Sequence, residues 1–568
     1  MTEPAIRGIT RHYVTIGRRQ LHYRRAGSGP PLIALHRLPR SSQDLVPFIQ
    51  AAMDRFTVIA PDLAGYGNSF PFESAPESLD PFCDDLAALL AALGLPRVLL
   101  YGEQAGAALA LSFTAGNKNK VAALATWDLD LPGALDLPPG AITPLPPFEP
   151  KWDGSHLAWL WAMLREQSAF HPWHTPTLNN RVDDHMPNPE ELQRRAVQFL
   201  TAGRHGRGYD LGYNAARTFN AGQTLNELKS PSLITARQRR DGLDPWRGVD
   251  SMSNSAIRSI ALEHTRATEG SLTFLGKHRF SADVPPAPAV TPIPGVLWHD
   301  FVNVDGGQLH FHCNSDAGTV PLLVQHDAAS SIGTVEPITQ SFLGHRSVYA
   351  FDMPGSGDSD RILTSENVEV EAYASVLNQA LEALVLEVVD FYGMWGGGFV
   401  GLSLALANPS RVRRLVMSNV FQHSGDEQSD IIANYTPDVS PQWHGGHLLQ
   451  CWHQMRDQGI YYPWFKQTRE GVIWREPFLD TAMVHERMCS LLKAGNMYRT
   501  AYRSHFIYPT YEKLAQTPVP TLLATSTWDP NNPHTLAAAD SAPNCEFQYL
   551  DEDFVKWGES FLPFLERP

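Results

Sequence analysis

The sequence predicts two tandem copies of an α/β fold. Each copy is a mostly parallel, doubly wound sheet with helices on both faces. Short apolar runs such as PPLIALH (30–36) and FTVIAPD (56–62) are typical of buried parallel strands, and helical patterns separate them. Strands that alternate with helices imply a parallel sheet covered on both sides. The second half of the chain repeats the same order of elements, which indicates two tandem domains.

The repeat is visible as residue identities at a nearly constant spacing. The segment WDGSHLAWLWAMLREQSAFHPW, which begins at Trp152, falls on WHGGHLLQCWHQMRDQGIYYPW, which begins at Trp443, at an offset of 291 residues. Upstream, His36 falls on His326 at an offset of 290 residues. So many matches at a nearly constant spacing are not expected by chance. We therefore interpret the chain as an internal duplication.

A proline-rich connector, SADVPPAPAVTPIPG (281–295), separates the copies. Five of its fifteen residues are proline, which favours an extended, semi-rigid segment. We therefore predict domains at 1–285 and 296–568. Each should contain a long, aromatic, mainly helical insertion, at about 132–228 and about 421–516.

The same succession of elements is predicted in each copy. The apolar runs RVLLYG, VAALATWD and SPSLITA continue the first sheet, and DPFCDDLAALLAALG is a predicted helix. In the second copy, EVEAYASVLNQALEALVLE is a predicted helix. The corresponding strands are VPLLVQH, SVYAFD, VVDFYG, VRRLVMSN and VPTLLATS.

Composition restricts the class of protein. The net charge of −15 argues against nucleic-acid binding, which needs clustered Lys and Arg. The five cysteines show no CxxC spacing, as expected in a reducing compartment. The N-terminal MTEPAIRGITRHYV lacks the apolar core of a secretory signal, and no apolar run is long enough to span a bilayer. We expect a cytoplasmic protein without a membrane partner.

Each copy has a sharp turn, flanked by glycines, between a strand and a helix. These segments are VLLYGEQAGAALAL, with Gln104 at the apex, and VVDFYGMWGGGFVGLSLAL, with Trp395 there. The pattern resembles the G-x-S-x-G nucleophile elbow of the α/β-hydrolase family, in its capped, epoxide-hydrolase-like group. The resemblance implies a covalent nucleophile at the apex, and neither glutamine nor tryptophan is one.

Two further motifs carry the resemblance through both copies. PDLAGYGNS (61–69) and FDMPGSGDS (351–359) resemble the family's D-x-x-G-x-G-x-S turn, which is structural. ALHRLPRS and VQHDAASS resemble its H-G segment, although Arg37 and Asp327 stand where glycine is usual.

The H-G segment and the elbow together imply an oxyanion hole. By analogy, the donors in the first copy are the backbone N–H groups of Leu38 and Ala105, beside His36. In the second copy they are those of Ala328 and Gly396. Such a hole would stabilise an enolate or a similar oxyanion without covalent chemistry.

The resemblance also indicates where an acid should lie. After the strand at 519–526 the second copy has Asp529, whereas the first offers Asp241 or Asp244. An alternative acid position after the sixth strand holds Asp128 in the first copy and Asn419 in the second.

The family's catalytic histidine precedes the last helix. His264 is the candidate in the first copy, and the second copy has no histidine in LDEDFVKWGESFLPFL. No copy assembles nucleophile, base and acid, and this asymmetry favours the first copy as the active one.

The insertions contribute histidines and aromatic residues. His156 and His447 occupy the same position in both copies, which fits a structural role or a general acid or base. Trp161 belongs to an aromatic set suited to an apolar or aromatic ligand, and Trp395 would fill a pocket floor.

No metal site or cofactor is predicted. The pairs His171/His174 and His444/His447 have helical spacing but lack a carboxylate–histidine pattern such as H-E-x-x-H. We expect His310 and His312, which alternate on a strand, to lie at the surface or to be satisfied.

We therefore predict a cofactor-independent enzyme of lyase, isomerase or cyclase type that acts by acid/base chemistry on a hydrophobic small molecule. One alternative is a non-catalytic binding or scaffold protein, and another is a hydrolase that activates water directly. We also expect the two copies to form an internal pseudo-dimer. The catalytic candidates are Gln104, His264, Asp241, Asp128 and His156, and the binding candidates are His36, Leu38, Ala105, Trp161, Trp395 and His447.

Overall fold

The computed structural model groups the chain into two compact units. One unit consists of Arg7–Glu149 and Trp159–Thr291, and the other contains Pro150–Ala158 and Pro292–Pro568. The residues that the structure describes are 8–129, 148–170, 173–181, 186–203, 208–217, 219, 221–237, 246, 256–261, 264–314, 320–365, 367–477, 479–542 and 544–567.

The first unit is built on an eight-stranded sheet with the order β1-β2-β4-β3-β5-β6-β7-β8. β1 and β2 pair antiparallel, β2 is antiparallel to β4, and the other neighbours are parallel. The strands are β1 (Ile9–Ile16), β2 (Arg19–Ala26), β3 (Pro31–Leu35), β4 (Thr57–Pro61), β5 (Val98–Glu103), β6 (Val121–Trp127), β7 (Ser232–Arg237) and β8 (Ala256–Ala261).

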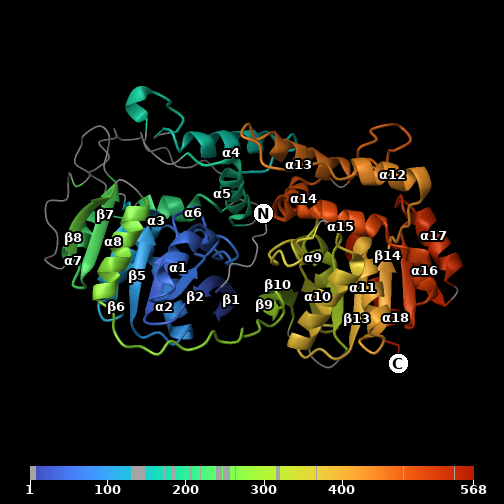
Figure 1. Ribbon diagram of the computed structural model, residues 1–568, viewed down its shortest axis with the longest axis horizontal. Coiled ribbons are helices and arrows are strands. Elements are labelled where there is room, and N and C mark those ends of the chain that lie inside the picture. The colour runs from blue at the N-terminus through green and yellow to red at the C-terminus, as the bar shows by residue number, and fades with distance from the viewer. Residues whose placement is uncertain are drawn as a thin grey trace. The chain divides into compact units, whose positions relative to one another are not determined.

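Helices cover both faces of this sheet (Figure 1). The strand order reverses direction after β4, so right-handed crossovers put α1 and α2 on opposite faces. Phe48 of α1, Leu272 of α8 and Tyr101 of β5 share one apolar core cluster, while α3 contacts α2 and β5. The helices are α1 (Val46–Ala52), α2 (Asp80–Ala92), α3 (Ala105–Gly116) and α8 (His264–Lys277).

The second unit repeats this plan with the sheet order β16-β15-β14-β13-β11-β12-β10-β9. Its antiparallel pairs are again at one edge, β9 with β10 and β10 with β12. The strands are β9 (Trp298–Val304), β10 (Gly307–Cys313), β11 (Leu322–Gln325), β12 (Val348–Phe351), β13 (Val389–Met394), β14 (Val412–Ser418), β15 (Thr521–Thr525) and β16 (Cys545–Tyr549).

The helices of the second sheet follow the same pattern. Val335 of α9, Phe561 of α18 and Tyr392 of β13 belong to one core cluster. The helices are α9 (Ile332–Gln340), α10 (Val370–Ala383), α11 (Gly396–Ala407), α17 (Asn532–Ser541) and α18 (Trp557–Leu565). The predicted α/β architecture, two mostly parallel sheets each covered by helices, is confirmed.

Helices also fill the insertion between the sixth and seventh strands of each sheet. α5 begins where Asn188 accepts the N–H of Glu191 and a proline occupies the first turn. The inserted helices are α4 (Ser155–Glu166), α5 (Pro189–Thr201), α6 (Leu211–Arg217) and α7 (Ala221–Glu227) in the first half. In the second half they are α12 (Gly425–Asn434), α13 (Gly446–Asp457), α14 (Thr481–Ala494), α15 (Met497–Phe506) and α16 (Thr510–Ala515). Among the described residues, no helix is long and apolar enough to cross a bilayer.

The segment Pro150–Ala158 groups with residues of the second half. Nε1 of Trp452 donates to the backbone carbonyl of Trp152 at 3.2 Å. A Cβ on Gly154, whose φ is +74°, would lie 3.0 Å from side-chain atoms of Leu449 and Trp452. Glycine therefore permits this close packing.

Candidate active site

Both elbow apices have the strained backbone of a sharp turn. Gln104 has φ 48° and ψ −113°, and Trp395 has φ 48° and ψ −127°. Such angles are uncommon for residues other than glycine and are found where the fold enforces them. A Cβ on Gly102 would lie 2.4 Å from the Gly106 carbonyl oxygen, so the flanking glycine is required for the strand to approach the helix.

In the first copy a carboxylate and an imidazole meet beside the elbow. Glu103, the last residue of β5, is 1% exposed, and its Oε1 lies 2.9 Å from Nε2 of His264. The hydroxyl of Tyr101 donates to the same Oε1 at 3.0 Å. Because a carboxylate only accepts, it holds the imidazole proton on Nε2 and leaves Nδ1 as the basic nitrogen. An imidazole oriented by a carboxylate in this way is the usual form of a histidine base.

Two neighbours fix this pair. The ring of His264 meets Trp127 edge-on, with centroids 4.4 Å apart. Nε of Arg37 lies 3.9 Å from Oε2 of Glu103 and donates to Asp44 at 2.6 Å. The His264 side chain is 39% exposed, so the imidazole is accessible to solvent while its carboxylate partner is not.

Gln104 is held by the residue at the alternative acid position. Its Nε2 donates to Oδ2 of Asp128 at 3.0 Å. Asp128 follows β6 directly and has φ 54°, as does Asn419 in the second copy. The structure thus brings together two of the predicted catalytic residues, Gln104 and Asp128. It also places the imidazole of His264 in contact with Glu103, the residue before Gln104.

His36 is engaged within the fold. Its Nδ1 lies 3.0 Å from the carbonyl oxygen of Arg37, and its Nε2 accepts the N–H of Leu63 at 3.0 Å. Leu38 is buried and Ala105 begins α3. The binding roles of these three residues stay predictions.

In the second copy Trp395 is bound to the acid position. Its side chain hydrogen-bonds to Asp529, a buried carboxyl that also accepts the N–H of Asn531 at 2.8 Å. Burial raises the pKa of Asp529 to about 6, although these hydrogen bonds and Arg475 oppose the rise. Asn419, which is 0% exposed, has no hydrogen-bond partner for either side-chain polar atom among the described residues.

The expected oxyanion donor of the second copy is already used. The backbone N–H of Gly396 donates to Oδ1 of Asp327 at 3.1 Å, and Nδ1 of His505 lies 3.2 Å from the same oxygen. Asp327 stands where the family's H-G segment has glycine, so its own carboxylate fills the position of an oxyanion. In the first copy, the equivalent Arg37 pairs with Asp44 instead.

His156 and His447 make the same contact in both repeats. Nδ1 of His156 accepts the N–H of Lys151, and Nδ1 of His447 accepts the N–H of Gln442, each at 3.1 Å. Burial lowers the pKa of both rings to about 4, so they are neutral at pH 7. This repetition fits a role in fixing the start of α4 and α13, and their catalytic or binding roles stay predictions.

The remaining predicted residues are placed as follows. Trp161 is 2% exposed and lies in α4. His156 falls in the compact unit of the second half, whereas Gln104 and His264 fall in the other. Asp241 lies outside the described residues.

Among the described residues, three groups of side chains in the second half could hold a metal ion. They are His299, His310 and His312; His423, Glu427 and His534; and His310, Asp352 and Asp358. Burial lowers the pKa values of His299 and His312 well below the usual histidine value.

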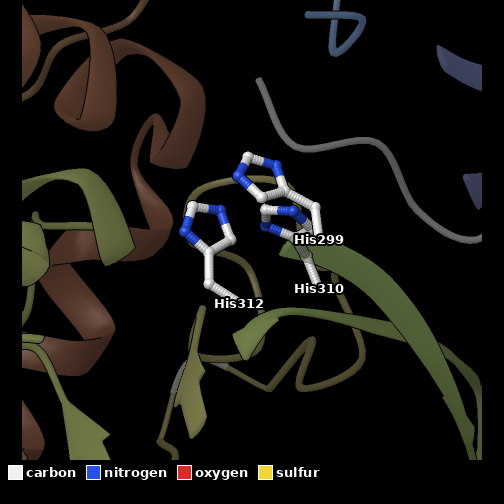
Figure 2. A group of neighbouring side chains, drawn as sticks. All are labelled: His299, His310 and His312. Atoms are coloured by element: carbon white, nitrogen blue, oxygen red, sulfur yellow. The ribbon is translucent and has the colours of Figure 1, made fainter. Parts of the chain in front are cut away.

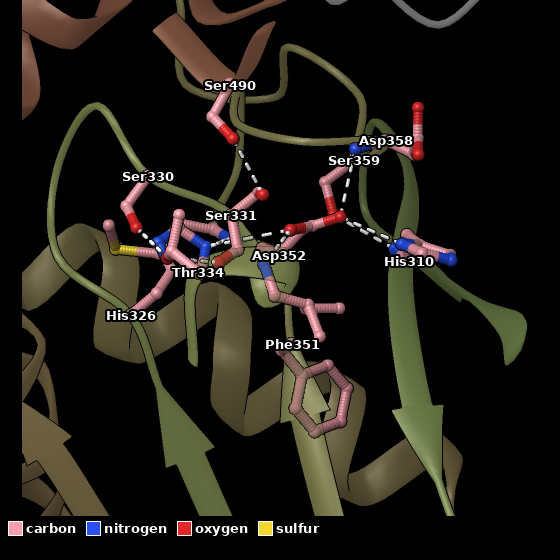
Figure 3. A network of polar contacts seen from close by, with 12 residues as sticks. His310, His326, Ser330, Ser331, Thr334, Phe351, Asp352, Asp358, Ser359 and Ser490 are labelled. Carbon is pink, nitrogen blue, oxygen red and sulfur yellow. Dashed lines mark hydrogen bonds and ion pairs between the residues drawn. The ribbon is translucent and has the colours of Figure 1, made fainter. Parts of the chain in front are cut away.

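His310 belongs to a polar network around the D-x-x-G-x-G-x-S turn (Figure 3). Its Nδ1 lies 2.8 Å from Oδ2 of Asp352, and its backbone N–H donates to Ser359. His22 makes the same two contacts, with Asp62 and Ser69, in the first copy. The histidine–aspartate pair is therefore a feature of the fold in both copies.

Sequence reasoning missed Glu103. It occupies a variable position of the elbow pattern, and its partner His264 is 161 residues away. The available signal was a carboxylate in an otherwise apolar strand, VLLYGE. Its counterpart in the second copy is Met394, so a carboxylate at this position of the elbow belongs to the first copy alone.

The chain belongs to the α/β-hydrolase-fold family, whose model matches residues 30–268 and 322–443. It is 36% identical over 129 residues to the soluble epoxide hydrolase of Corynebacterium sp. (strain C12), which is 22% of this chain and 44% of that protein. It is 34% identical over 127 residues to the 2-hydroxy-6-oxononadienedioate/2-hydroxy-6-oxononatrienedioate hydrolase of Cupriavidus pinatubonensis, 21% of this chain and 43% of that protein. The chain thus spans less than half the length of these curated relatives.

Solved structures are also similar to part of this chain. The epoxide hydrolase CorEH is 19% identical with a TM-score of 0.37, covering 48% of this chain and all (100%) of that one. The enol-lactonase of Burkholderia xenovorans LB400 is 15% identical with a TM-score of 0.35, covering 47% of this chain and 96% of that one.

Proposed function

We propose that the first copy is a cofactor-independent enzyme that carries out acid/base chemistry on a hydrophobic small molecule, in a reaction of lyase, isomerase or cyclase type. The observation that carries this proposal is the 2.9 Å contact between the Glu103 carboxylate and the His264 imidazole, one residue before the elbow apex. A covalent ester would need a nucleophile at that apex, and the glutamine there is not one.

His264 is the proposed general base. Its Nε2 is directed at Glu103 and its ring rests on Trp127, so the imidazole is oriented before substrate arrives. The carboxylate stabilises the imidazolium that forms when Nδ1 takes a proton. General base catalysis of this kind contributes about 10²–10⁴-fold to a rate.

Gln104 is the proposed polar contact to the reacting group. Its amide nitrogen is held by Asp128 at 3.0 Å, which fixes the orientation of the amide oxygen and nitrogen. The backbone N–H of Ala105, the first residue of α3, is the proposed oxyanion donor. Together these groups suit a substrate that passes through an enolate or a similar anion.

The second copy is proposed to be non-catalytic. Asp327 occupies its Gly396 donor, Trp395 is bound to Asp529, and no carboxylate stands at the Glu103 position. Buried Asn419, whose side-chain polar atoms have no hydrogen-bond partner within the described part of the chain, favours a binding role for the second copy.

The test compares conversion of a host-cell metabolite extract by the unmodified chain and by three single variants: Glu103→Gln, His264→Gln and Gln104→Ala. Mass spectrometry in H₂¹⁸O reports both conversion and its class. We expect one metabolite to be converted without ¹⁸O uptake. The rate of its conversion should fall about 10²–10⁴-fold in His264→Gln. His278→Gln, just beyond the other end of α8, is the matched control and should convert normally.

The other possible outcomes would contradict this proposal, each in a different way. Incorporation of ¹⁸O together with cleavage of a single bond by water would replace the proposal with a hydrolase that activates water directly. A metabolite that stays bound to the chain without being converted would support a binding protein. Unchanged conversion in both His264→Gln and Gln104→Ala would remove the site assignment.

A further inference from the structure

The edge hairpin of the second sheet carries three histidines whose nitrogens converge. Each of His299, His310 and His312 offers one ring nitrogen, and these atoms lie within 4.8 Å of one another. Figure 2 shows the three rings gathered beside the β9–β10 strand pair. The rings of His299 and His312 are stacked with centroids 3.5 Å apart, and His310 lies 5.0 Å from His312.

The register of the hairpin produces this cluster. His299 on β9 is directly opposite His312 on β10, and His310 is two residues before His312 on the same strand. Side chains two apart on a strand, and those directly opposite on the neighbouring strand, share one face of the sheet. All three histidines are therefore on one face.

From this geometry we propose that His299, His310 and His312 bind one divalent transition-metal cation of the zinc class. Three imidazoles are a common ligand set for such a cation, and a fourth position remains for water.

The carboxylate beside His310 suits a metal-binding histidine. The Asp352 carboxylate lies 2.8 Å from Nδ1 of His310, which places the ring proton there and leaves the lone pair on Nε2. Carboxylates that orient histidine ligands in this way are typical of metal sites. Asp358 adds negative charge nearby, and Lys493 pairs with it at 2.9 Å.

A second observation points to a missing partner. His312 is 7% exposed, and its Nδ1 has no hydrogen-bond partner among the described residues. Buried polar atoms are nearly always satisfied, so an unsatisfied imidazole nitrogen within a group of three is explained by an ion or water.

The first copy provides an internal comparison. His22 corresponds to His310 and keeps the aspartate partner, but the residues opposite each other on its hairpin are Arg11 and Arg24. These arginines stand where the second copy has His299 and His312. The histidine–aspartate pair alone is thus common to the fold, whereas the three-histidine group is specific to the second copy.

The experiment uses the full chain, stripped with a chelator and titrated with Co²⁺, followed by competition with Zn²⁺. We expect about one equivalent per chain, with the visible spectrum of cobalt in a nitrogen-ligated, low-coordinate site. In His312→Gln and, separately, in His299→Gln the affinity for Co²⁺ should fall at least tenfold, since substituting even a residue that only orients a ligand costs about 10–100-fold. His299 is only half-buried, so its substitution disturbs the fold less than that of buried His312. The test therefore holds even if His312→Gln fails to fold.

Two control variants locate the ion. His22→Gln changes the equivalent histidine of the first copy and should keep full stoichiometry. His423→Gln changes the other histidine cluster and should also keep it. Absence of binding, unchanged affinity in both hairpin variants, or loss of the ion in His423→Gln would each overturn the proposal.

Discussion

Oδ1 of Asp327 accepts the backbone N–H of Gly396 at 3.1 Å, which makes a carboxylate of the chain itself the occupant of the second elbow. The first elbow is different, because Arg37 at the equivalent position turns to Asp44 and Glu103. The residues that replace the H-G glycine therefore act differently in the two copies, since Asp327 binds the backbone N–H at its own elbow whereas Arg37 pairs with acidic side chains. Catalysis by electrostatic stabilisation depends on such donors being preorganised for the reacting atom.

Removing the Asp327 side chain should let an external carboxylate bind the second copy. In Asp327→Gly the Gly396 N–H loses its acceptor, and the half-buried Arg487, which interacts with Asp327, loses a nearby negative charge. We expect benzoate to bind at least tenfold more tightly than to the unmodified chain, about 1.4 kcal/mol, measured by calorimetric titration. Asp327→Asn still fills the space and should show no gain. Equal affinity in Asp327→Gly and Asp327→Asn would contradict this account.

The Asp529 carboxyl should make stability depend on pH. Burial raises its pKa to about 6 from 3.8, so between these values the folded chain binds more protons than the unfolded chain. The free energy of unfolding therefore falls as pH rises through this window. Asp529→Asn removes that fall, and the variant should be more stable than the unmodified chain at pH 8 by up to about 3 kcal/mol.

Calorimetric Tm values from pH 4 to pH 8 measure the Asp529 effect. The difference between the two proteins should shrink as pH falls to 4, close to the ordinary pKa of 3.8, below which the carboxyl is mostly protonated in both states. Trp395→Phe removes a hydrogen bond that lowers the pKa of Asp529, and should extend the window to higher pH. A constant difference in Tm between Asp529→Asn and the unmodified chain at every pH would show that the carboxyl does not titrate in this range.

Much of the fold was predictable because its signals are local. The apolar run of β5 and the glycines at 102 and 106 lie within a few residues, and they specify strand, turn and helix together. The duplication strengthened every such prediction, since each element appears twice at nearly the same offset. The outer strands of each sheet and their pairing required the structure; these strands are β1, β2 and β8 in the first copy and β9, β10 and β16 in the second.

The candidate site was less predictable because its contacts are long-range. Gln104 and Asp128 were found from the motif, but Glu103 was not, since its importance comes from a histidine on α8. The loss of glycine at Asp327 was evident, whereas the use of its carboxylate as an acceptor depends on how two loops meet. The three-histidine group depends on the register of β9 against β10, which composition does not fix.

Gln104 and Asp128 should be coupled energetically. A hydrogen bond to a charged acceptor contributes about 1.5–3 kcal/mol when buried, and Gln104 is only half-buried. We expect a coupling of about 1 kcal/mol in the double-mutant cycle of Gln104→Ala and Asp128→Ala. Hydrogen exchange in peptides from β5 and β6 provides the local opening free energies. Additivity within about 0.3–0.5 kcal/mol would show that the contact is not formed in solution.

A buried ion group offers the sharpest test of the duplication. Asp390 is 0% exposed and accepts hydrogen bonds from Arg346 at 2.5 Å and Arg413 at 2.7 Å. Asp390→Leu alone leaves Arg346, which is 3% exposed, without its carboxylate, and should cost about 3–5 kcal/mol. Calorimetry of the full chain measures the loss.

The first copy shows which residues replace this group. By the offsets of the repeat, Phe56, Leu99 and Ala122 stand at the positions of Arg346, Asp390 and Arg413, and the first two are fully buried. The triple variant Arg346→Phe/Asp390→Leu/Arg413→Ala should therefore recover most of the stability lost in Asp390→Leu, since well-packed apolar residues often equal a buried ion pair. Leu99→Asp, the reverse change, buries an unpaired carboxylate in the first sheet and should destabilise it. If the triple variant is no more stable than Asp390→Leu, the two cores differ in more than these three positions, because packing around them would then fail to accept the first copy's side chains.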